Sequence, residues 1–228
     1  MTMDLRGRGH SEITPPGTYG WHSHILDLLA IGEFFGQASF GLVGHSMGGF
    51  IGMELAASYP ERCHALVLID ALGVPEPSAL VAIAQSVSRL GRTYPSSAAA
   101  VSHVRDSGLI APWNTFWDRY IEWELAPGPG ATVQCRTSLS AVQEDAADAA
   151  EHDVYALWSR IRCPTLLIRA TTPLGSNGGL VVSAADAERF AADFGIATVV
   201  NLDVDHYTVL VDPAAIGEID HFMRSSDR

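Results

Sequence analysis

Hydrophobic positions along the chain are grouped in two ways, and each way predicts one kind of element. Short, continuously apolar runs predict buried strands. These runs cover residues 40–44, 65–69, 165–168 and 197–202. Longer segments in which apolar residues recur every three or four positions predict amphipathic helices. The two kinds alternate over most of the chain. Such alternation predicts an α/β fold with a parallel sheet covered by helices on both faces.

The predicted helices begin and end at typical boundary residues. Residues 19–36 carry Ile25, Leu28, Leu29 and Phe35 at helical spacing, with polar residues between them. Further helices are expected over about 47–58, which Pro60 stops, over about 183–194, which Ser183 caps, and from Pro213 to about 223.

The alternation stops between Ala71 and about Ala156. This stretch contains helix-like segments over 78–90, 96–106, 112–125 and 137–149, and no convincing strand. A helical block between two sheet strands is typical of a lid over the carboxyl edge of the sheet. The predicted organisation is therefore a core of residues 1–73 and 157–228, with a helical lid of residues 74–156.

Size and charge restrict the partners. The 228 residues suffice for one large domain or for a core with an inserted lid. No run approaches the roughly 20 apolar residues of a membrane span, and no signal-like segment opens the chain. A formal net charge of −12 argues against nucleic acid or an anionic membrane as partner. We expect a cytoplasmic protein that binds a small molecule, with its oligomeric state left open.

Cysteine usage and cofactor motifs narrow the chemistry further. Cys63, Cys135 and Cys163 are odd in number and widely scattered, which predicts reduced structural thiols. No G-x-G-x-x-G follows a predicted strand, no Walker loop is present, and no Cys/His cluster has zinc spacing. We expect no cofactor and no metal site.

One short segment carries a specific chemical signal. The sequence Gly44-His45-Ser46-Met47-Gly48-Gly49 follows a predicted strand and leads into a predicted helix. A serine with a small residue two positions away on each side, at such a junction, is the pattern of a nucleophile elbow. The sharp turn strains the serine backbone and pushes its hydroxyl outward, while the N–H of Met47 points toward the same space. Ser46 is the candidate nucleophile.

Several further segments accompany this elbow in a fixed order. They are Asp4–Ser11, Tyr59–Arg62, Ala65–Asp70, Cys163–Ile168 and Asp205–Tyr207. Together with the elbow they make the chain resemble the α/β-hydrolase superfamily, in its lidded branch. The resemblance implies a mostly parallel sheet flanked by helices, with a helical lid after the strand that follows the nucleophile. It also implies a nucleophile, an acid and a base on loops at the carboxyl ends of strands, with the histidine last.

The resemblance assigns the base and leaves two positions for the acid. His206 follows the last predicted strand, where the family has its base. Most relatives carry the acid after the next-to-last strand, but residues 169–177 contain no carboxylate, and Asp186 lies inside a predicted helix. Some branches use the end of the strand after the nucleophile, and Asp70 stands there. We predict Asp70 as the acid, with Asp205 as the weaker alternative because neighbouring strand residues point in different directions.

The sequence shows only one of the two N–H donors expected in an oxyanion hole. Met47 supplies one N–H donor, and the family takes a second from a His-Gly loop after an early strand. No such loop precedes Asp4, and the chain begins with what looks like the end of a strand. We therefore expect the N-terminal strands and the His-Gly oxyanion loop to be missing from this sequence.

The leading functional hypothesis is a cofactor-free serine hydrolase. It would cleave a carboxylic ester of a small or medium apolar molecule through an acyl-enzyme. Thioester, lactone, amide and carbon–carbon bond hydrolysis use the same triad, and a non-catalytic hydrolase-fold ligand-binding protein is the alternative from another class. Trp113, Phe116 and Trp117 are candidates for an apolar substrate pocket, although aromatic residues at helical spacing also form ordinary cores.

Overall fold

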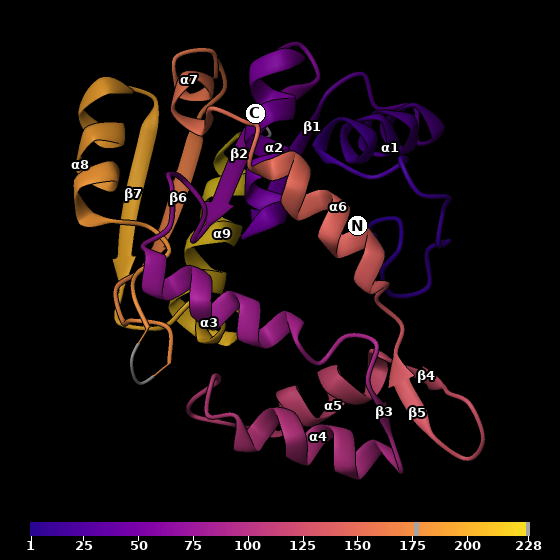
Figure 1. Ribbon diagram of the computed structural model, residues 1–228. Helices are drawn as coiled ribbons and strands as arrows, with labels where there is room; N and C mark the ends of the chain where they lie inside the picture. Colours follow the sequence, from indigo (N-terminus) through magenta and orange to yellow (C-terminus); the bar gives the residue numbers. More distant parts are fainter. Residues whose placement is uncertain (176–177, 227–228) are drawn as a thin grey trace. The chain divides into compact units, whose positions relative to one another are not determined.

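A four-stranded parallel sheet organises one part of the molecule (Figure 1). The computed structural model describes residues 1–175 and 178–226. The strands are β1 (Phe40–His45), β2 (Cys63–Ile69), β6 (Thr165–Ala170) and β7 (Ala197–Leu202), in the order β1-β2-β6-β7. All three neighbouring pairs are parallel. Every predicted strand of the sheet is therefore confirmed, and so is the α/β fold class.

The chain divides into two compact units. One unit comprises residues 25–80 and 152–228, and the other comprises residues 1–24 and 81–151. The first 24 residues group with the second unit because α6 (Leu139–Ala149) holds them: Asp145 and Asp148 accept the N–H groups of Gly20 and Trp21, both at 2.7 Å. The predicted division into a core of 1–73 and 157–228 and a lid of 74–156 stays a prediction.

Helices pack on both faces of the sheet. Val67 and Ile69 of β2 contribute to an apolar cluster that includes Ala215 of α9 (Pro213–Ser226). Leu66, which points to the opposite face, lies against Gly52 of α2 (Met47–Ser58). The central strands are apolar at nearly every position because neither face meets water. The other elements of this unit are α1 (Trp21–Phe34), which begins before residue 25, α3 (Pro77–Val87), which continues past residue 80, α7 (Val154–Trp158), α8 (Ala184–Asp193) and the 3-10 helix η1 (Thr208–Val211).

The second unit contains a small sheet that sequence reasoning missed. Strands β3 (Thr93–Tyr94), β4 (Leu125–Pro127) and β5 (Val133–Cys135) form an antiparallel sheet in the order β3-β5-β4. The expectation of no strand between Ala71 and Ala156 is therefore wrong. Strands of two or three residues are too short to show an apolar alternation, and the turn between β4 and β5 is closed by a bond from Gly128 N–H to the Thr132 carbonyl, at 2.8 Å.

The helices of this unit follow the predicted ones closely. They are α4 (Ser97–Asp106), α5 (Thr115–Trp123) and α6. Helix α5 ends before its predicted limit because Leu125 enters β4. A buried cluster joins the N-terminal segment to α6: Asp145 accepts from His24 Nε2 at 2.9 Å and pairs with the Arg8 guanidinium at 2.5 Å.

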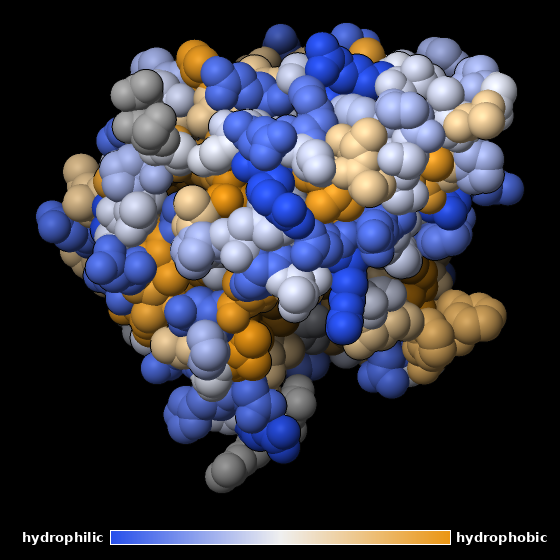
Figure 2. Space-filling model, turned by 90° about the horizontal axis from the view of Figure 1, so that it is seen from below, coloured by the Kyte–Doolittle hydropathy of each residue, from blue (hydrophilic) through white to orange (hydrophobic). Residues whose placement is uncertain are grey.

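Figure 2 shows hydrophobic and hydrophilic residues interspersed on the face that it draws, which is normal for globular proteins. Cys63, Cys135 and Cys163 are free thiols and all three are buried. In residues 1–175 and 178–226, no helix is both long and apolar enough to cross a membrane. The cytoplasmic location stays a prediction.

Candidate active site

Ser46 stands at a strained turn between β1 and α2. Its φ is 52° and its ψ is −123°, a backbone conformation that non-glycine residues rarely adopt. A side chain at Gly44 would collide with the backbone of Gly48 and Gly49, and one at Gly49 would come within 2.6 Å of the Ala71 methyl. Gly48, by contrast, faces open space among the described residues. The close approach of α2 to the end of β1 thus requires two glycines of the motif and holds Ser46 on the turn.

His206 links Ser46 to Asp70. Its Nε2 lies 3.0 Å from Ser46 Oγ, and its Nδ1 lies 2.8 Å from Asp70 Oδ2. An ionised carboxylate can only accept, so Nδ1 carries the proton and Nε2 presents its lone pair to the serine hydroxyl. Asp70 is 1% exposed and His206 is 3% exposed, so water competes little for this pair. The structure brings the three predicted residues together in one hydrogen-bonded chain.

The carboxyl ends of the strands supply these side chains. Ser46 directly follows β1, and Asp70 directly follows β2 with φ at 47°. His206 stands between β7 and η1. Parallel strands end at one edge of a sheet, which explains why residues 160 and 136 positions apart in the chain meet.

The other carboxylates named by sequence reasoning have different partners. Asp205 Oδ1 accepts the N–H groups of Tyr207 and Thr208, both at 2.8 Å, and so fixes the turn that follows His206. Asp186 Oδ2 accepts the Tyr155 hydroxyl at 3.2 Å. In the loop after β6, Ser176 and Asn177 lie outside the described residues.

His45 belongs to this site although sequence reasoning gave it no role. Its Nε2 lies 2.8 Å from the His206 carbonyl oxygen, and the two imidazole rings are 4.4 Å apart between centroids. Burial, with a smaller contribution from the neighbouring His206, lowers the pKa of His45 to about 3. The only available signal was its place beside Ser46 at the end of β1, because the contact joins residues 161 positions apart.

Met47 is the first residue of α2 and directly follows Ser46. The N-terminal end of a helix favours negative charge nearby, because the peptide dipoles align along the helix. This is the kind of environment that stabilises an oxyanion. The role of the Met47 N–H in an oxyanion hole stays a prediction.

The predicted pocket residues all lie on or beside α5, in the unit of residues 1–24 and 81–151. Trp113 donates from Nε1 to Asp118 at 3.0 Å. Trp117 is 1% exposed and packs edge-on against Phe116 and Tyr120, at ring centroid distances of 5.0 and 5.8 Å. Phe116 is 45% exposed. Trp117 is therefore a core residue of its unit, and the substrate contacts of all three residues stay a prediction.

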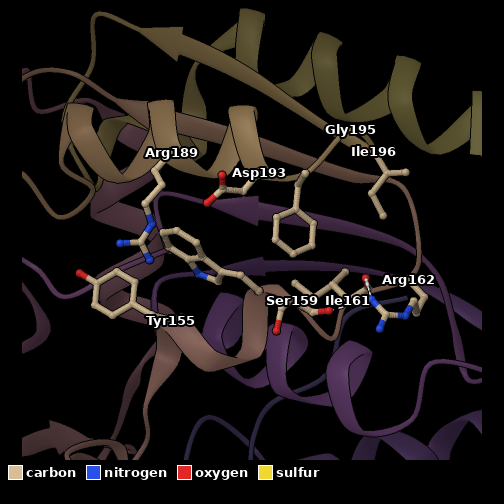
Figure 3. A pocket seen from close by; sticks show the side chains of 10 residues that line it. Tyr155, Ser159, Ile161, Arg162, Arg189, Asp193, Gly195 and Ile196 are labelled. Atoms are coloured by element: carbon tan, nitrogen blue, oxygen red, sulfur yellow. Dashed lines mark hydrogen bonds between the residues drawn. The ribbon is translucent and has the colours of Figure 1, made fainter.

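A hollow of about 560 Å³ lies between α7, α8 and the segments that lead into β6 and β7 (Figure 3). Arg189 stacks over the rings of Tyr155 and Trp158 along it, at 4.9 and 4.6 Å. Ile161 and Ile196 line its end near the amino ends of the two strands. Ser46, Asp70 and His206 stand at the carboxyl ends instead, so this hollow is separate from the triad.

Comparison with known proteins now adds to the geometry. A sequence profile described as the alpha/beta hydrolase fold matches residues 1–213. The chain belongs to the alpha/beta hydrolase family. Among solved structures, it is similar to an alpha/beta hydrolase from Novosphingobium aromaticivorans, with 25% identity and a TM-score of 0.79, covering 97% of this chain and 78% of that one. E-2-(Acetamidomethylene)succinate hydrolase shares the fold at 24% identity and a TM-score of 0.82, covering 97% and 80%.

Sequence relatives match a shorter segment of the chain. The protein named "Putative carbamate hydrolase RutD" from Caulobacter segnis is 33% identical over 78 residues, which are 34% of this chain and 29% of that protein. A "Serine hydrolase-like protein" from Danio rerio is 32% identical over 74 residues, which are 32% of this chain and 23% of that protein. The match spans less than a third of the length of either relative. Family membership therefore rests on the profile match over residues 1–213.

Proposed function

We propose that this chain is a serine hydrolase that cleaves a carboxylic ester of a small or medium apolar molecule. The observation that carries the proposal is the hydrogen-bonded chain from Asp70 through His206 to Ser46, at 2.8 and 3.0 Å. Its serine stands on a strained elbow at the start of a helix. Membership of the alpha/beta hydrolase family supports the same class of reaction. The preference for an apolar ester is an expectation from the sequence that the exposed Phe116 and the partly exposed Trp113 support and the buried Trp117 does not.

The first half of the reaction forms an acyl-enzyme. Ser46 Oγ attacks the ester carbonyl carbon while His206 Nε2 takes the hydroxyl proton. Asp70 stabilises the resulting imidazolium through Nδ1 and keeps its own charge. The carbonyl oxygen becomes negative in the tetrahedral intermediate, and the Met47 N–H at the start of α2 stabilises it. The imidazolium then gives its proton to the leaving alcohol as the carbon–oxygen bond breaks.

The second half returns the enzyme to its starting state. His206, neutral again, takes a proton from a water molecule that attacks the acyl carbon. The new tetrahedral intermediate collapses, the proton passes to Ser46 Oγ, and the carboxylic acid leaves. One water molecule is consumed: its oxygen joins the acyl carbon, and one of its protons passes through His206 to Ser46 Oγ.

Carbamate hydrolysis is a second candidate substrate class. Its specific support is the relative named as a carbamate hydrolase, 33% identical over 78 residues. A carbamate presents the same carbonyl carbon to Ser46, so the triad chemistry is unchanged. The two classes differ in the acyl group that Ser46 would carry, a carbamoyl group instead of an alkanoyl group.

Two measurements test the proposal. Covalent labelling by a fluorophosphonate detects an activated serine, and mass spectrometry locates the label on Ser46. Turnover of p-nitrophenyl acetate, butyrate and octanoate, compared with p-nitrophenyl N-methylcarbamate, then separates ester from carbamate cleavage. We expect labelling at Ser46, turnover of the esters, and a burst of p-nitrophenol equal to the enzyme concentration if deacylation is slow.

A wild-type chain that neither labels nor hydrolyses any of these compounds would contradict the proposal. It would favour the alternative, a non-catalytic hydrolase-fold ligand-binding protein. If Ser46 is labelled but only the carbamate is turned over, the serine mechanism holds and the substrate class is a carbamate instead of an ester.

A further inference from the structure

The His206 segment is held at separate points by different elements. Asp70, after β2, holds the ring at Nδ1, and Asp205 fixes the following turn through the N–H groups of Tyr207 and Thr208. His45, at the end of β1, holds the main-chain carbonyl of His206 at 2.8 Å. A single hydrogen bond at Nδ1 leaves the ring able to swing about that bond. The contacts of His45 restrict the backbone from which the ring extends.

The two imidazole rings are also in contact. Their centroids are 4.4 Å apart and their planes are inclined by 37°. A carbonyl oxygen can only accept, so His45 donates from Nε2–H, and its Nδ1 is unprotonated when the ring is neutral. The His45 side chain thus contacts His206 in two ways, through its ring and through its Nε2–H.

We propose that His45 is a positioning residue for the reaction: its Nε2–H and its ring together keep His206 Nε2 directed at Ser46 Oγ. This inference rests on the proposed function, because the positioning matters only if His206 transfers a proton. His45 contacts the base and does not touch the reacting atoms.

Neutrality of His45 is part of this role. His206 becomes an imidazolium during the reaction, and a second positive charge 4.4 Å away would oppose that step. Burial and the proximity of His206 hold the pKa of His45 at about 3, so the ring is neutral at neutral pH. Among the described residues, Asp70 faces His206 Nδ1, and the Tyr207 ring lies edge-on 5.4 Å from His206.

Variants separate the N–H donor from the packing role. His45→Phe keeps a ring and removes the donor, whereas His45→Gln keeps a donor near the position of Nε2 and removes the ring. His221→Phe, at an exposed site on α9, is the matched control. Small displacements of catalytic groups cost about 100-fold in rate. We expect kcat for p-nitrophenyl butyrate to fall by about that factor in His45→Phe with KM nearly unchanged, and His45→Gln to recover part of it, because the donor returns without the ring.

Imidazole ¹⁵N spectra of the wild-type chain provide a readout that needs neither turnover nor a folded variant. Between pH 5 and pH 8 we expect His45 to stay neutral, with its proton on Nε2. A titrating His45, or a proton on Nδ1, would overturn the positioning role. So would a His45→Phe variant with wild-type kcat, or one in which KM rises and kcat does not fall.

Failure of this inference is distinguishable from failure of the proposed function. A wild-type chain that labels at Ser46 and hydrolyses esters, but has an ionised His45, overturns only the positioning role. A wild-type chain without labelling or hydrolysis overturns the proposed function, and the positioning role with it.

Discussion

Asp70 Oδ1 accepts a hydrogen bond from the backbone N–H of Ala170, at 3.1 Å, while Oδ2 of the same carboxylate faces His206. Ala170 is the last residue of β6, and β2 pairs with β6 along Leu66–Ile69. The predicted acid therefore stands after β2 but is held by the end of β6, the next-to-last strand of the sheet. Because the two strand ends are neighbours, either one can present a carboxylate to the same imidazole.

Asp70→Asn tests whether this carboxylate is the third member of the triad. The amide keeps the shape of the side chain but no longer balances an imidazolium or enforces the Nδ1–H tautomer. We expect kcat for ester hydrolysis to fall by about 10⁴-fold, as in other triads that lose this charge. Steady-state kinetics with p-nitrophenyl butyrate measures it.

Asp205→Asn is the matched control for that change. Its Oδ1 accepts two backbone N–H groups, and an asparagine oxygen can accept both as well. We expect less than about a tenfold change in kcat, because the carboxylate that faces His206 Nδ1, that of Asp70, is kept. A larger effect at Asp205 than at Asp70 would reverse the assignment of the acid.

Two replacements of Ser46 separate the role of its hydroxyl in the reaction from the effect of its strained backbone on stability. Ser46→Ala should abolish labelling and hydrolysis while the melting temperature stays nearly the same. Ser46→Gly should abolish activity equally and raise the free energy of unfolding above that of Ser46→Ala by about 1–3 kcal/mol, because glycine adopts φ of 52° and ψ of −123° without strain. Urea titrations of the two inactive variants make the comparison. Equal stabilities would show that the elbow stores no such strain.

Stability should depend on pH through His45. In the unfolded chain its pKa is near 6.5, and in the folded chain it is about 3. Between these values the unfolded state binds the extra proton, so the free energy of unfolding falls as pH falls from about 6.5 toward 3, by at most about 1.4 kcal/mol per pH unit. Above pH 6.5 this contribution is fully present.

The His45→Gln variant isolates this contribution from that of the carboxylates. Urea unfolding at intervals from pH 4 to pH 7 should give a steeper loss for the wild-type chain than for the variant. His221→Gln, on the exposed surface of α9, should keep the wild-type slope. Parallel slopes in all three proteins would mean that His45 titrates normally in the folded chain.

Trp117 and Phe116 are neighbours on α5 with opposite exposures, 1% and 45%. Trp117→Ala should therefore lower the free energy of unfolding by about 3–5 kcal/mol, and Phe116→Ala by less than about 1 kcal/mol. Chemical denaturation measures both. If Phe116 also lines the substrate pocket, its loss should change the preference among acetate, butyrate and octanoate esters. An unchanged preference would remove it from the pocket.

Local sequence patterns were sufficient for the elements that depend on neighbouring residues. The apolar runs of β1, β2, β6 and β7 predict the sheet because strands buried on both faces need continuous apolar sequence. The helix after Ser183 was predicted from its cap, and Ser183 Oγ does accept the Asp186 N–H, at 3.0 Å. The two- and three-residue strands β3, β4 and β5 were not predicted, because strands this short show no apolar alternation in the sequence.

Within the candidate site, the sequence by itself determined the serine turn and predicted His206 as the base and a short list for the acid, because family motifs fix those positions along the chain. Only the tertiary structure decided that Asp70 and not Asp205 faces His206, and that His45 holds the His206 carbonyl. It also decided that residues 1–24 group with 81–151. Each of these outcomes depends on the direction of a side chain toward a partner more than 100 residues away. Hydrophobic periodicity reports the burial of a residue but carries no information about which distant group it meets.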